Sequence, residues 1–317
     1  MHELTALEQQ IVTALQIDPR ASWRKIASVL REPERTVARR GSELLESGIV
    51  GVLGIRLRPT PVLVEMRCAP GTARVAVQAM AQRADTSFVY MVTGTADCLA
   101  EILTDRDRLH SALADELPGI AGLQHVNTYP ILRYFKTLRA WQPGPLTVEQ
   151  RAALQPVPLR DPAVFGEYPE MTKADDQIAT VLCEDGRASF EAIARRVGVS
   201  EATARRRTEW LLETNTVHLR ALVEPAALGL PVEALLWIKT SPAQLETLGQ
   251  RLAALPETRY VAAITGDYQI LADVTVANNQ ALYDFTSSGA WTADVAQIST
   301  SLLLHARKRG GRLTPGK

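Results

Sequence analysis

Residues 15–50 read LQIDPRASWRKIASVLREPERTVARRGSELLESGIV, and residues 182–217 read LCEDGRASFEAIARRVGVSEATARRRTEWLLETNTV. The two stretches align without a gap. They share an Arg-Ala-Ser triplet, a threonine and an Arg-Arg pair, at Arg20-Ala21-Ser22 and Arg187-Ala188-Ser189, Thr36 and Thr203, and Arg39-Arg40 and Arg206-Arg207. A repeat of this length indicates one supersecondary unit used twice, so both copies predict the same local structure.

Both copies have the pattern of three helices with a short break between the second and the third. In the second copy the break contains Gly198 and ends at Ser200, a residue that favours the N-cap position. In the first copy Pro33 stands in place of this serine and Gly41 interrupts the third helix, so we expect that copy to be less regular. Helix, short turn and helix are typical of a helix-turn-helix unit. The predicted helices cover about 6–16, 22–30 and 34–47, and about 174–184, 189–197 and from 201 onward.

Arginine is concentrated in the second and third helices of each copy. Between Arg195 and Arg207 there are five arginines and one acid, Glu201. At about 100° per residue, Arg206 points away from the apolar stripe. A charge run is ordinarily a solvated face, but this segregation favours a surface that meets DNA phosphates and the major groove. The residues predicted to contact DNA are Arg35, Thr36, Arg39, Arg40, Ser189, Ser200, Glu201, Thr203, Arg205, Arg206 and Arg207.

A second repeated pair follows the first. Residues 62–94 align without a gap with residues 234–266, and both stretches end in Thr-Gly, at Thr93-Gly94 and Thr265-Gly266. Each copy predicts the order strand, helix, strand, strand, helix, strand, which is that of a ferredoxin-like sandwich. The Thr-Gly pair falls at the turn between the two middle strands, where a glycine with positive φ is the simplest interpretation.

The composition limits the class of protein. The chain has 317 residues, a formal net charge of zero and three widely spaced cysteines. It lacks the CxxC and Cys/His patterns of metal sites, so no metal or other cofactor is expected. No apolar run approaches the ~20 residues of a membrane span, and the N-terminus has no signal pattern, so a cytoplasmic protein is expected. Because DNA-binding domains are often strongly basic, any DNA contact must come from a local patch.

The repeats and the composition together predict six segments of an α+β chain. Residues 141–170 contain six prolines and are expected to form a semi-rigid linker. The basic end of the chain is expected to be disordered beyond about residue 309. The segments are a winged-type helix-turn-helix at 1–54, a ferredoxin-like domain at 58–140, the linker at 141–170, a second helix-turn-helix at 171–223, a second ferredoxin-like domain at 230–309 and a basic tail at 310–317.

The combination resembles the Lrp/AsnC family of transcription factors. In the second copy the resemblance rests on three motifs and a glycine turn: Glu184-Asp185-Gly186-Arg187-Ala188-Ser189, Val197-Gly198-Val199-Ser200, Leu228-Gly229 and Thr265-Gly266-Asp267-Tyr268. The first copy is looser, since Pro19 replaces the glycine and Pro33 the capping serine. The resemblance covers nearly the whole chain, twice, and implies a sequence-specific DNA-binding regulator.

The resemblance also implies sheet-to-sheet dimers, larger assemblies and a small effector, often an amino acid, near the glycine turn. Carried over residue by residue, the effector-binding positions are Gly94, Thr95, Asp97, Gly266, Asp267, Tyr268 and Gln269. Because one chain contains both copies, the two sandwiches are expected to pair within the chain as a pseudo-dimer. Two such chains are then expected to associate further as a homodimer.

Two other functions remain open at this point. Some proteins of similar architecture are sirohaem decarboxylases, in which a His/Arg-rich, Tyr-Asn-Trp-like sequence surrounds the middle hairpin. Here the two hairpins read YMVTGTADCLAEI and AAITGDYQILADV, without histidine or arginine, so an enzyme is not expected. The other interpretation is a ligand- or partner-binding protein whose helix-turn-helix units do not bind DNA.

Overall fold

The computed structural model describes residues 4–57, 60–155 and 169–314 and divides into two compact units. Each unit combines segments from both halves of the chain. Within the described residues, the helical unit comprises 4–57, 142–155 and 169–229, and the barrel unit comprises 60–141 and 230–314.

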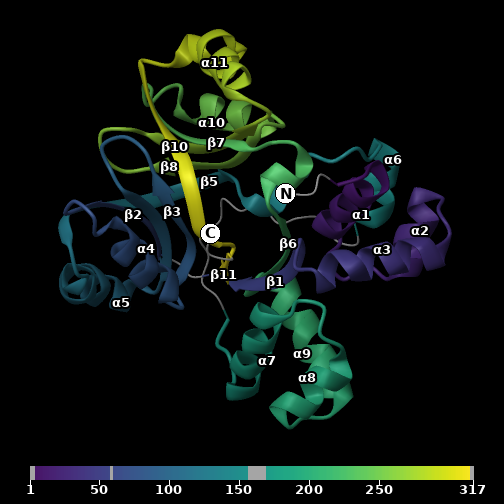
Figure 1. Cartoon of the computed structure of the whole chain (residues 1–317). Coiled ribbons are helices and arrows are strands. Elements are labelled where there is room, and N and C mark those ends of the chain that lie inside the picture. Colours follow the sequence, from purple (N-terminus) through teal and green to yellow (C-terminus); the bar gives the residue numbers. More distant parts are fainter. Residues whose placement is uncertain (1–3, 58–59, 156–168, 315–317) are drawn as a thin grey trace. The chain divides into compact units, whose positions relative to one another are not determined.

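The helical unit contains two bundles of three helices (Figure 1). Their starts follow from side-chain caps: Thr5 and Thr172 form capping boxes with the acids three residues later, and Ser22, Ser189 and Ser200 cap the later helices. Pro33 provides no side-chain cap. The helices are α1 (Ala6–Ile17), α2 (Trp23–Leu30) and α3 (Glu34–Glu46) in the first bundle, and α7 (Lys173–Glu184), α8 (Phe190–Val197) and α9 (Glu201–Glu213) in the second.

The turn between the second and third helices has the same backbone form in both bundles. Gly198 ends α8 with φ +78°, and Arg31 ends α2 with φ +58°. Glycine adopts this left-handed conformation without strain, whereas arginine does not. The glycine at position 41 within α3 is explained by tertiary packing, because a Cβ there would lie 2.4 Å from the Trp23 ring.

The two bundles are joined by a strand from each copy. β1 (Val50–Arg56) pairs antiparallel with β6 (Val217–Val223), and Leu53 lies opposite its own equivalent in the repeat, Arg220. This two-stranded sheet is therefore centred on a pseudo-twofold axis that relates the two copies. A winged helix-turn-helix would have a hairpin of its own, but here each bundle contributes a single strand, so the predicted wing is absent from the described residues.

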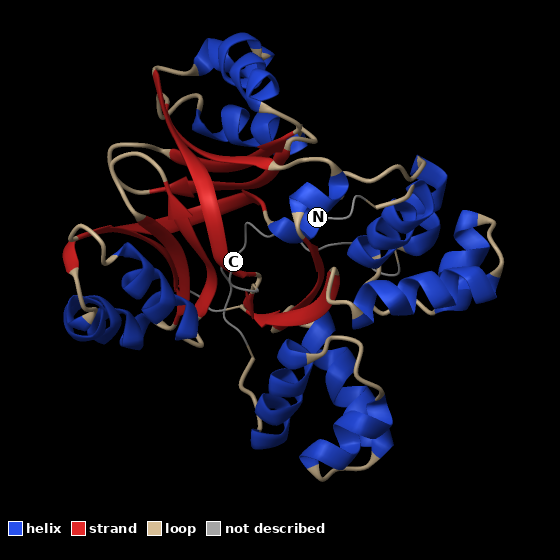
Figure 2. Cartoon of the chain, in the orientation of Figure 1, coloured by secondary structure: helices blue, strands red, loops and turns tan. Residues whose placement is uncertain are grey.

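The barrel unit has the order strand, helix, strand, strand, helix, strand in each copy. Figure 2 shows its strands in red with helices, in blue, against them. The elements of the first copy are β2 (Thr60–Cys68), α4 (Ala73–Gln82), β3 (Thr86–Val92), β4 (Cys98–Thr104), α5 (Arg106–Ser111) and β5 (Leu123–Lys136). Those of the second are β7 (Val232–Lys239), α10 (Leu245–Ala254), β8 (Thr258–Ile264), β9 (Ile270–Val276), α11 (Asn279–Ser288) and β10 (Gln297–Arg309).

The strands of the two copies form one closed barrel. The order is β10-β3-β4-β2-β5-β8-β9-β7, and β7 pairs back to β10. The last strand of each copy crosses to the other copy, since Ile131 pairs with Ile264 and Leu303 with Val92. These two pairings are equivalent under the repeat. The two halves thus pair within one chain, and closure leaves the main sheet without a free edge.

Helices cover the outside of each half of the barrel, α4 and α5 on the first and α10 and α11 on the second (Figure 1). Separate apolar clusters lie under the helices of each half, for example around Met80 and around Leu252. A third cluster, with Leu63, Tyr90 and Trp237, fills the barrel and draws on both halves. α5 covers less than the helix that the sequence pattern predicts at about 106–115, because the chain continues as a π turn at Ala112–Glu116 and a 3-10 turn at Leu117–Gly119.

The proline-rich segment contains the short helix that Thr147 and Gln150 predict at about 148–155, and the tail is more structured than expected where it is described. α6 (Val148–Leu154) begins at a Thr147 capping box and packs on α1 and α2. Residues 156–168 lie outside the described residues. The tail turns back through Gly310 and Gly311, both with positive φ, and β11 (Arg312–Leu313) pairs with β10. The expected disorder is therefore wrong for residues 310–314, because two glycines permit a tight hairpin.

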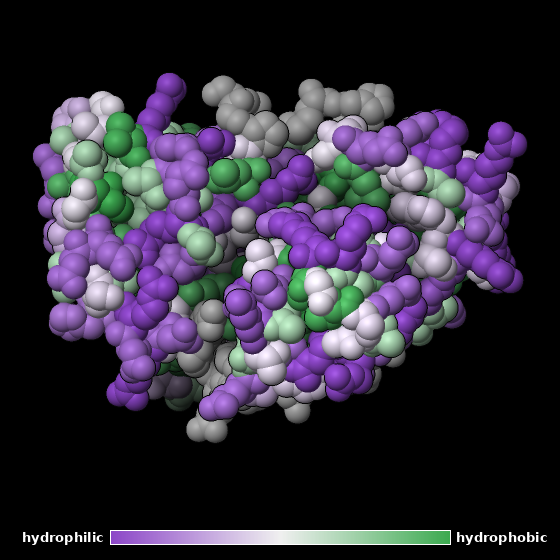
Figure 3. All heavy atoms as spheres, turned by 90° about the horizontal axis from the view of Figure 1, so that it is seen from below, coloured by the Kyte–Doolittle hydropathy of each residue, from purple (hydrophilic) through white to green (hydrophobic). Residues whose placement is uncertain are grey.

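The surface is mostly polar on the face seen in Figure 3, where hydrophobic residues appear as separate small patches. No described helix is both long enough and apolar enough to cross a membrane. Among the described residues no group of three or more His, Cys, Asp or Glu side chains could hold a metal ion.

Candidate nucleic-acid interface and ligand cleft

The outward faces of α3 and α9 carry exposed arginines. On α9, Arg206 is exposed without an ion pair to any described residue, and Arg205 lies 3.5 Å from Glu201 and 4.4 Å over the Phe190 ring. On α3, Arg35 is exposed without an ion pair to a described residue, and Arg39 lies 2.7 Å from Glu43. These guanidinium groups are held by little beyond surface pairs, so they can reorganise onto phosphate at low cost.

Arg40 and Arg207, which are also predicted to contact DNA, pair with acids of the first helix. Arg207 forms a bidentate ion pair with the fully buried Asp175 of α7 and lies 4.2 Å over the Trp210 ring. Arg40 lies 3.3 Å from Glu8, the equivalent acid of the first copy. Burial alone would raise the pKa of Asp175, but the bonds from Arg207 and Thr172 outweigh it and lower that pKa. These two arginines fasten the third helix to the first.

Of the hydroxyl side chains predicted to contact DNA, those of Ser189 and Ser200 cap helices. Ser189 and Ser200 accept the N–H groups of Ala192 and Thr203, at 3.1 Å in both cases. The Thr203 hydroxyl lies 2.9 Å from that of Ser200, and Thr36 is half-buried. Ser189 and Ser200 thus fix the starts of α8 and α9, and the exposed arginines remain the candidates for charged contacts.

A reciprocal pair of arginines ties the two bundles together. Arg20 donates to the carbonyls of Gly186 and Ala188 at 2.7 and 2.9 Å, while Arg187 donates to those of Pro19 and Ala21 at 2.7 and 3.0 Å. Each guanidinium also covers an aromatic ring of the other copy, Phe190 at 4.9 Å and Trp23 at 4.7 Å. Both bundles are thus presented as one symmetric pair.

In the barrel unit, the two glycine turns require glycine. Gly94 has φ +103° and Gly266 φ +104°. A Cβ on Gly266 would lie 3.1 Å from the Tyr129 ring, and one on Gly94 would lie 3.2 Å from the Ser301 hydroxyl. Each turn therefore packs against the last strand of the other copy.

The side chains of Asp97 and Gln269 anchor these turns. Asp97 accepts the N–H of Cys68 at 2.8 Å, and Gln269 accepts that of Thr240 at 3.1 Å. The two bonds are equivalent under the repeat. The resemblance predicts effector binding for both residues, and in the structure each side chain also accepts a backbone N–H.

Two of the predicted effector residues, Thr95 and Tyr268, line a cleft of about 530 Å³. That volume is in the range of small-molecule sites. Both copies contribute to it. Its lining residues are Glu65, Arg67, Thr95, Gln124, His125, Asn127 and Tyr129 from the first copy, and Trp237, Tyr268, Ser299 and Ser301 from the second.

One corner of the cleft combines aromatic rings with a carboxylate. The Tyr129 and Trp237 rings lie 5.2 Å apart at 59°, and those of Trp237 and Tyr268 lie 6.1 Å apart at 55°. Glu65 Oε2 accepts the Tyr129 hydroxyl at 2.9 Å and the Asn127 amide at 3.1 Å. Burial, followed by the charge of Glu65, raises the pKa of Tyr129 well above its usual value, so this hydroxyl remains a donor.

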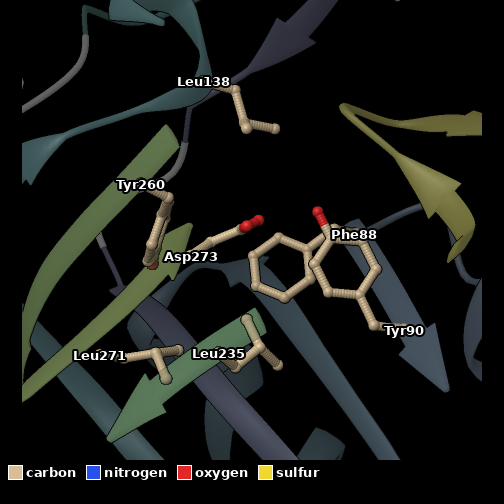
Figure 4. Close-up of a pocket in the computed structure, with 7 residues that line it drawn as sticks. All are labelled: Phe88, Tyr90, Leu138, Leu235, Tyr260, Leu271 and Asp273. Atoms are coloured by element: carbon tan, nitrogen blue, oxygen red, sulfur yellow. The ribbon is translucent and has the colours of Figure 1, made fainter. Parts of the chain in front are cut away.

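A much smaller cavity of about 10 Å³ lies inside the barrel, with room for roughly one water molecule. Figure 4 shows the Asp273 carboxylate and the Tyr90 hydroxyl reaching into this space among apolar side chains. Asp273 is 3% exposed and lies 3.8 Å from Arg259. Burial raises the pKa of Asp273 to about 6, against the attraction of Arg259.

Sequence reasoning missed Glu65, Tyr129 and Trp237, and it missed the acids inside the barrel, Glu101 and Asp273. A signal was present, because each acid interrupts an otherwise apolar strand: VLVEM, CLAEIL and ILADV. An acid in such a strand requires buried donors or a ligand. No comparable signal marks Trp237, since a tryptophan in a strand is more often part of the core.

Two family models match the second half of the chain. The AsnC-type helix-turn-helix domain matches residues 171–212, and the Lrp/AsnC ligand binding domain matches residues 233–313. The first range holds α7, α8 and most of α9, and the second holds most of the second half of the barrel.

Similar proteins carry regulator names. An uncharacterised HTH-type transcriptional regulator of Pyrococcus abyssi is 32% identical over 143 residues, which are 44% of this chain and 90% of that protein. The HTH-type transcriptional regulator FL11 of Pyrococcus horikoshii is 26% identical over 139 residues, which are 44% of this chain and 92% of that protein. Each of these relatives thus matches less than half of this chain.

A likeness to solved structures extends over nearly the full length of the chain. The sirohaem decarboxylase NirDL superposes with a TM-score of 0.62 over 95% of this chain and 92% of that one, at 12% identity. At this identity the likeness concerns the fold alone. The family models and the regulator from Pyrococcus abyssi confirm the resemblance seen in the sequence: the chain belongs to the Lrp/AsnC family of HTH-type transcriptional regulators.

Proposed function

We propose that this chain is a tandem-duplicated regulator that presents two helix-turn-helix units to double-stranded DNA and responds to a small ligand in the barrel cleft. The observation that carries the DNA part is the matched pair of exposed arginines, Arg39 and Arg206, on third helices that the reciprocal Arg20 and Arg187 contacts tie together. Two linked recognition helices favour DNA with two half-sites about one helical turn, or a multiple of it, apart.

The proposed division follows the repeat. Residues 1–54 and 171–223 form the DNA-binding domains, and residues 58–140 and 230–309 form the two ferredoxin-like halves of the ligand-binding barrel. The bonds of β5 to β8 and of β10 to β3 support a pseudo-dimer of these halves within one chain. A single chain then supplies what a single-copy member of this architecture would need two chains to supply.

The DNA contact is tested by replacing Arg39 and Arg206 together with alanine. Operator fragments are first selected from genomic DNA by footprinting with the wild-type protein. The double variant should bind them at least tenfold more weakly, with the slope of log K against log salt reduced by about two. The matched control removes Arg74 and Arg106, two exposed arginines of the barrel unit. Equal losses in both double variants, or no loss in either, would contradict the assignment.

We propose no catalytic role for the chain. The two middle hairpins contain neither histidine nor arginine, and the matched family models are those of regulators. The likeness to the sirohaem decarboxylase fold calls for a direct control. Sirohaem added to the protein should produce neither a Soret shift nor loss of a carboxylate by mass spectrometry; either change would support an enzyme.

We also propose that two chains associate. Leu132 on β5 and Leu304 on β10 occupy equivalent positions and are 57% and 61% exposed. Such outward leucines at matched sites would be covered in a symmetric dimer. Light scattering at micromolar concentration should report about twice 34.7 kDa or a larger even multiple, and Leu132→Ser with Leu304→Ser should return the chain to its own mass.

A further inference from the structure

The two third helices share one exposed arginine and differ in the position of a second. Arg39 of α3 and Arg206 of α9 are equivalent under the repeat. The other exposed arginine of α3 is Arg35, one helical turn before Arg39, whereas that of α9 is Arg205, directly before Arg206. The residues of the other copy that are equivalent to Arg35 and Arg205 are both alanines, Ala202 and Ala38. The repeat thus keeps the exposed charge and moves one arginine along the helix.

The displacement of this arginine is comparable to the spacing of base pairs. Position 35 in α3 corresponds to position 202 in α9, three residues before Arg205. At about 1.5 Å per residue, three residues correspond to about 4.5 Å along the helix axis and a rotation of about 60°. Successive base pairs of B-DNA lie about 3.4 Å apart. In the major groove, an arginine moved by this amount reaches a base edge about one base pair away.

The two displaced arginines also differ in what holds them. Arg205 lies 4.4 Å over the Phe190 ring and 3.5 Å from Glu201. Arg35 is exposed and has neither an ion pair nor a ring contact with a described residue. Because the ring and the acid restrict the Arg205 side chain before DNA arrives, it loses less conformational freedom on binding than Arg35 does. The two copies therefore differ in the strength of this contact as well as in its position.

We propose that the operator is directional: each half-site contains a guanine at a different position, read by Arg35 in one half-site and by Arg205 in the other. The inference rests on the proposed function, because it names the kind of DNA sequence that the same two helices bind. A guanidinium donates two hydrogen bonds to O6 and N7 of guanine in the major groove. Arg39 and Arg206 supply the phosphate contact common to both half-sites. Since the reciprocal arginine contacts tie the two bundles together, one chain binds such an operator in a single orientation.

The test exchanges the arginine positions between the copies. Ala202→Arg with Arg205→Ala gives α9 the arrangement of α3, and Arg35→Ala with Ala38→Arg gives α3 the arrangement of α9. Each full-length protein selects binding sites from duplexes that contain ~20 random base pairs, about two helical turns. The wild type should select two unlike half-sites whose guanines are offset by about one base pair. Each exchange variant should select a palindrome, and the two palindromes should differ.

Single substitutions test the same assignment without adding a side chain. Arg35 and Arg205 are exposed, so alanine at either position leaves the core unchanged. Each variant should bind the selected operator about tenfold more weakly and lose the guanine preference in its own half-site only. Arg195→Ala removes an exposed arginine of α8 and is the matched control. It should leave the base preference of both half-sites unchanged.

Failure of this inference is distinguishable from failure of the proposed function. A wild-type protein that binds no duplex overturns both. A wild-type protein that binds DNA but selects a palindrome overturns the directional operator and leaves the regulator intact. The same holds if Arg35→Ala and Arg205→Ala relax the same positions in both half-sites, or if either exchange variant still selects the wild-type site.

Discussion

The two copies of the repeat keep equivalent side-chain contacts in the helical unit, whereas their side chains have diverged in the barrel unit. In the helical unit the equivalent contacts are preserved: Arg20 and Arg187 make the same reciprocal bonds, and the α1-to-α3 and α7-to-α9 ion pairs match. In the barrel the backbone pairings match, yet the side chains differ. Ser87 in the first half corresponds to Arg259 in the second, and the buried acids Glu101 and Asp273 have different partners.

The difference follows from the kind of partner that each unit is proposed to bind. Two half-sites on DNA are similar objects, so two similar binding surfaces suit them. A small ligand on a pseudo-twofold axis is a single object without that symmetry, so a site for it gains from two unlike halves. Inside the barrel, Glu101 accepts the hydroxyls of Tyr134 and Tyr260 at 2.8 Å, whereas Asp273 lies beside arginine.

The largest effect is expected from removing Arg259, which belongs to the group of buried charged residues in the second half of the barrel. Arg259 pairs with Glu233 and lies beside Asp273, and all three are nearly inaccessible to solvent. Arg259→Met leaves Asp273 as a buried charge without a nearby cation on that side and should cost ~3–5 kcal/mol. The equivalent change, Ser87→Ala, removes one hydroxyl from Glu101 and should cost about 1 kcal/mol. Hydrogen exchange of the barrel strands measures both, and equal costs would refute the asymmetry.

The second prediction addresses the symmetric unit. Arg20→Ala and Arg187→Ala each remove two charged hydrogen bonds to carbonyls and one contact with an aromatic ring. Each should lower the free energy of unfolding of the helical unit by ~2–4 kcal/mol, and the two losses should agree within about 1 kcal/mol. Hydrogen exchange of α2 and α8 reports the change. A loss confined to one variant would show that the contact is not reciprocal in solution.

Local chemistry in the sequence was enough to place most helices and turns. Ser200 caps α9 as expected from the sequence, and Gly266 occupies the turn between two strands. These features depend on neighbours a few residues away, which a single sequence displays directly. The repeat supplied the rest, because an uncertain pattern in one copy could be compared with its equivalent.

Features that depend on distant partners were not predictable in the same way. β1 and β6 pair with each other across more than 150 residues, so neither has a local hairpin signal. A helical wheel gives the direction of Arg207 but not its partner Asp175 in another helix. The cleft requires the pseudo-twofold pairing of both halves before Glu65 and Trp237 meet, and no spacing in the sequence shows that.

The third prediction concerns how the stability of the barrel depends on pH through the buried Asp273. The folded-state pKa of Asp273 is raised from 3.8 to about 6, so protonation favours the fold. Its contribution is complete below pH ~4 and is lost as the pH rises through about 6. The barrel should therefore lose on the order of 2–3 kcal/mol between these values, at ~1.4 kcal/mol per pKa unit. Asp273→Asn should flatten that slope in urea unfolding followed at several pH values. An unchanged slope would assign the pH dependence to another group.

The smallest expected effect tests how closely the two DNA-binding helices match. Arg39 forms an i,i+4 ion pair with Glu43 at 2.7 Å, whereas the position equivalent to Glu43 in the second copy is Trp210, which has no carboxylate to offer Arg206. A phosphate must therefore compete with an acid for Arg39 but not for Arg206. Glu43→Gln should release Arg39 and raise operator affinity about two- to threefold, because an exposed i,i+4 pair contributes ~0.3–0.5 kcal/mol and a nearby negative charge is also removed.

The control for this change has to separate competition for Arg39 from the loss of a negative charge near the DNA. Glu46→Gln serves, since Glu46 is an exposed acid of α3 without an ion pair to any described residue. It removes the same charge from the same helix, and only Glu43→Gln also frees Arg39. Fluorescence anisotropy on an operator fragment at fixed salt measures both variants. Equal gains in the two would mean that general charge, rather than competition for Arg39, separates the two copies.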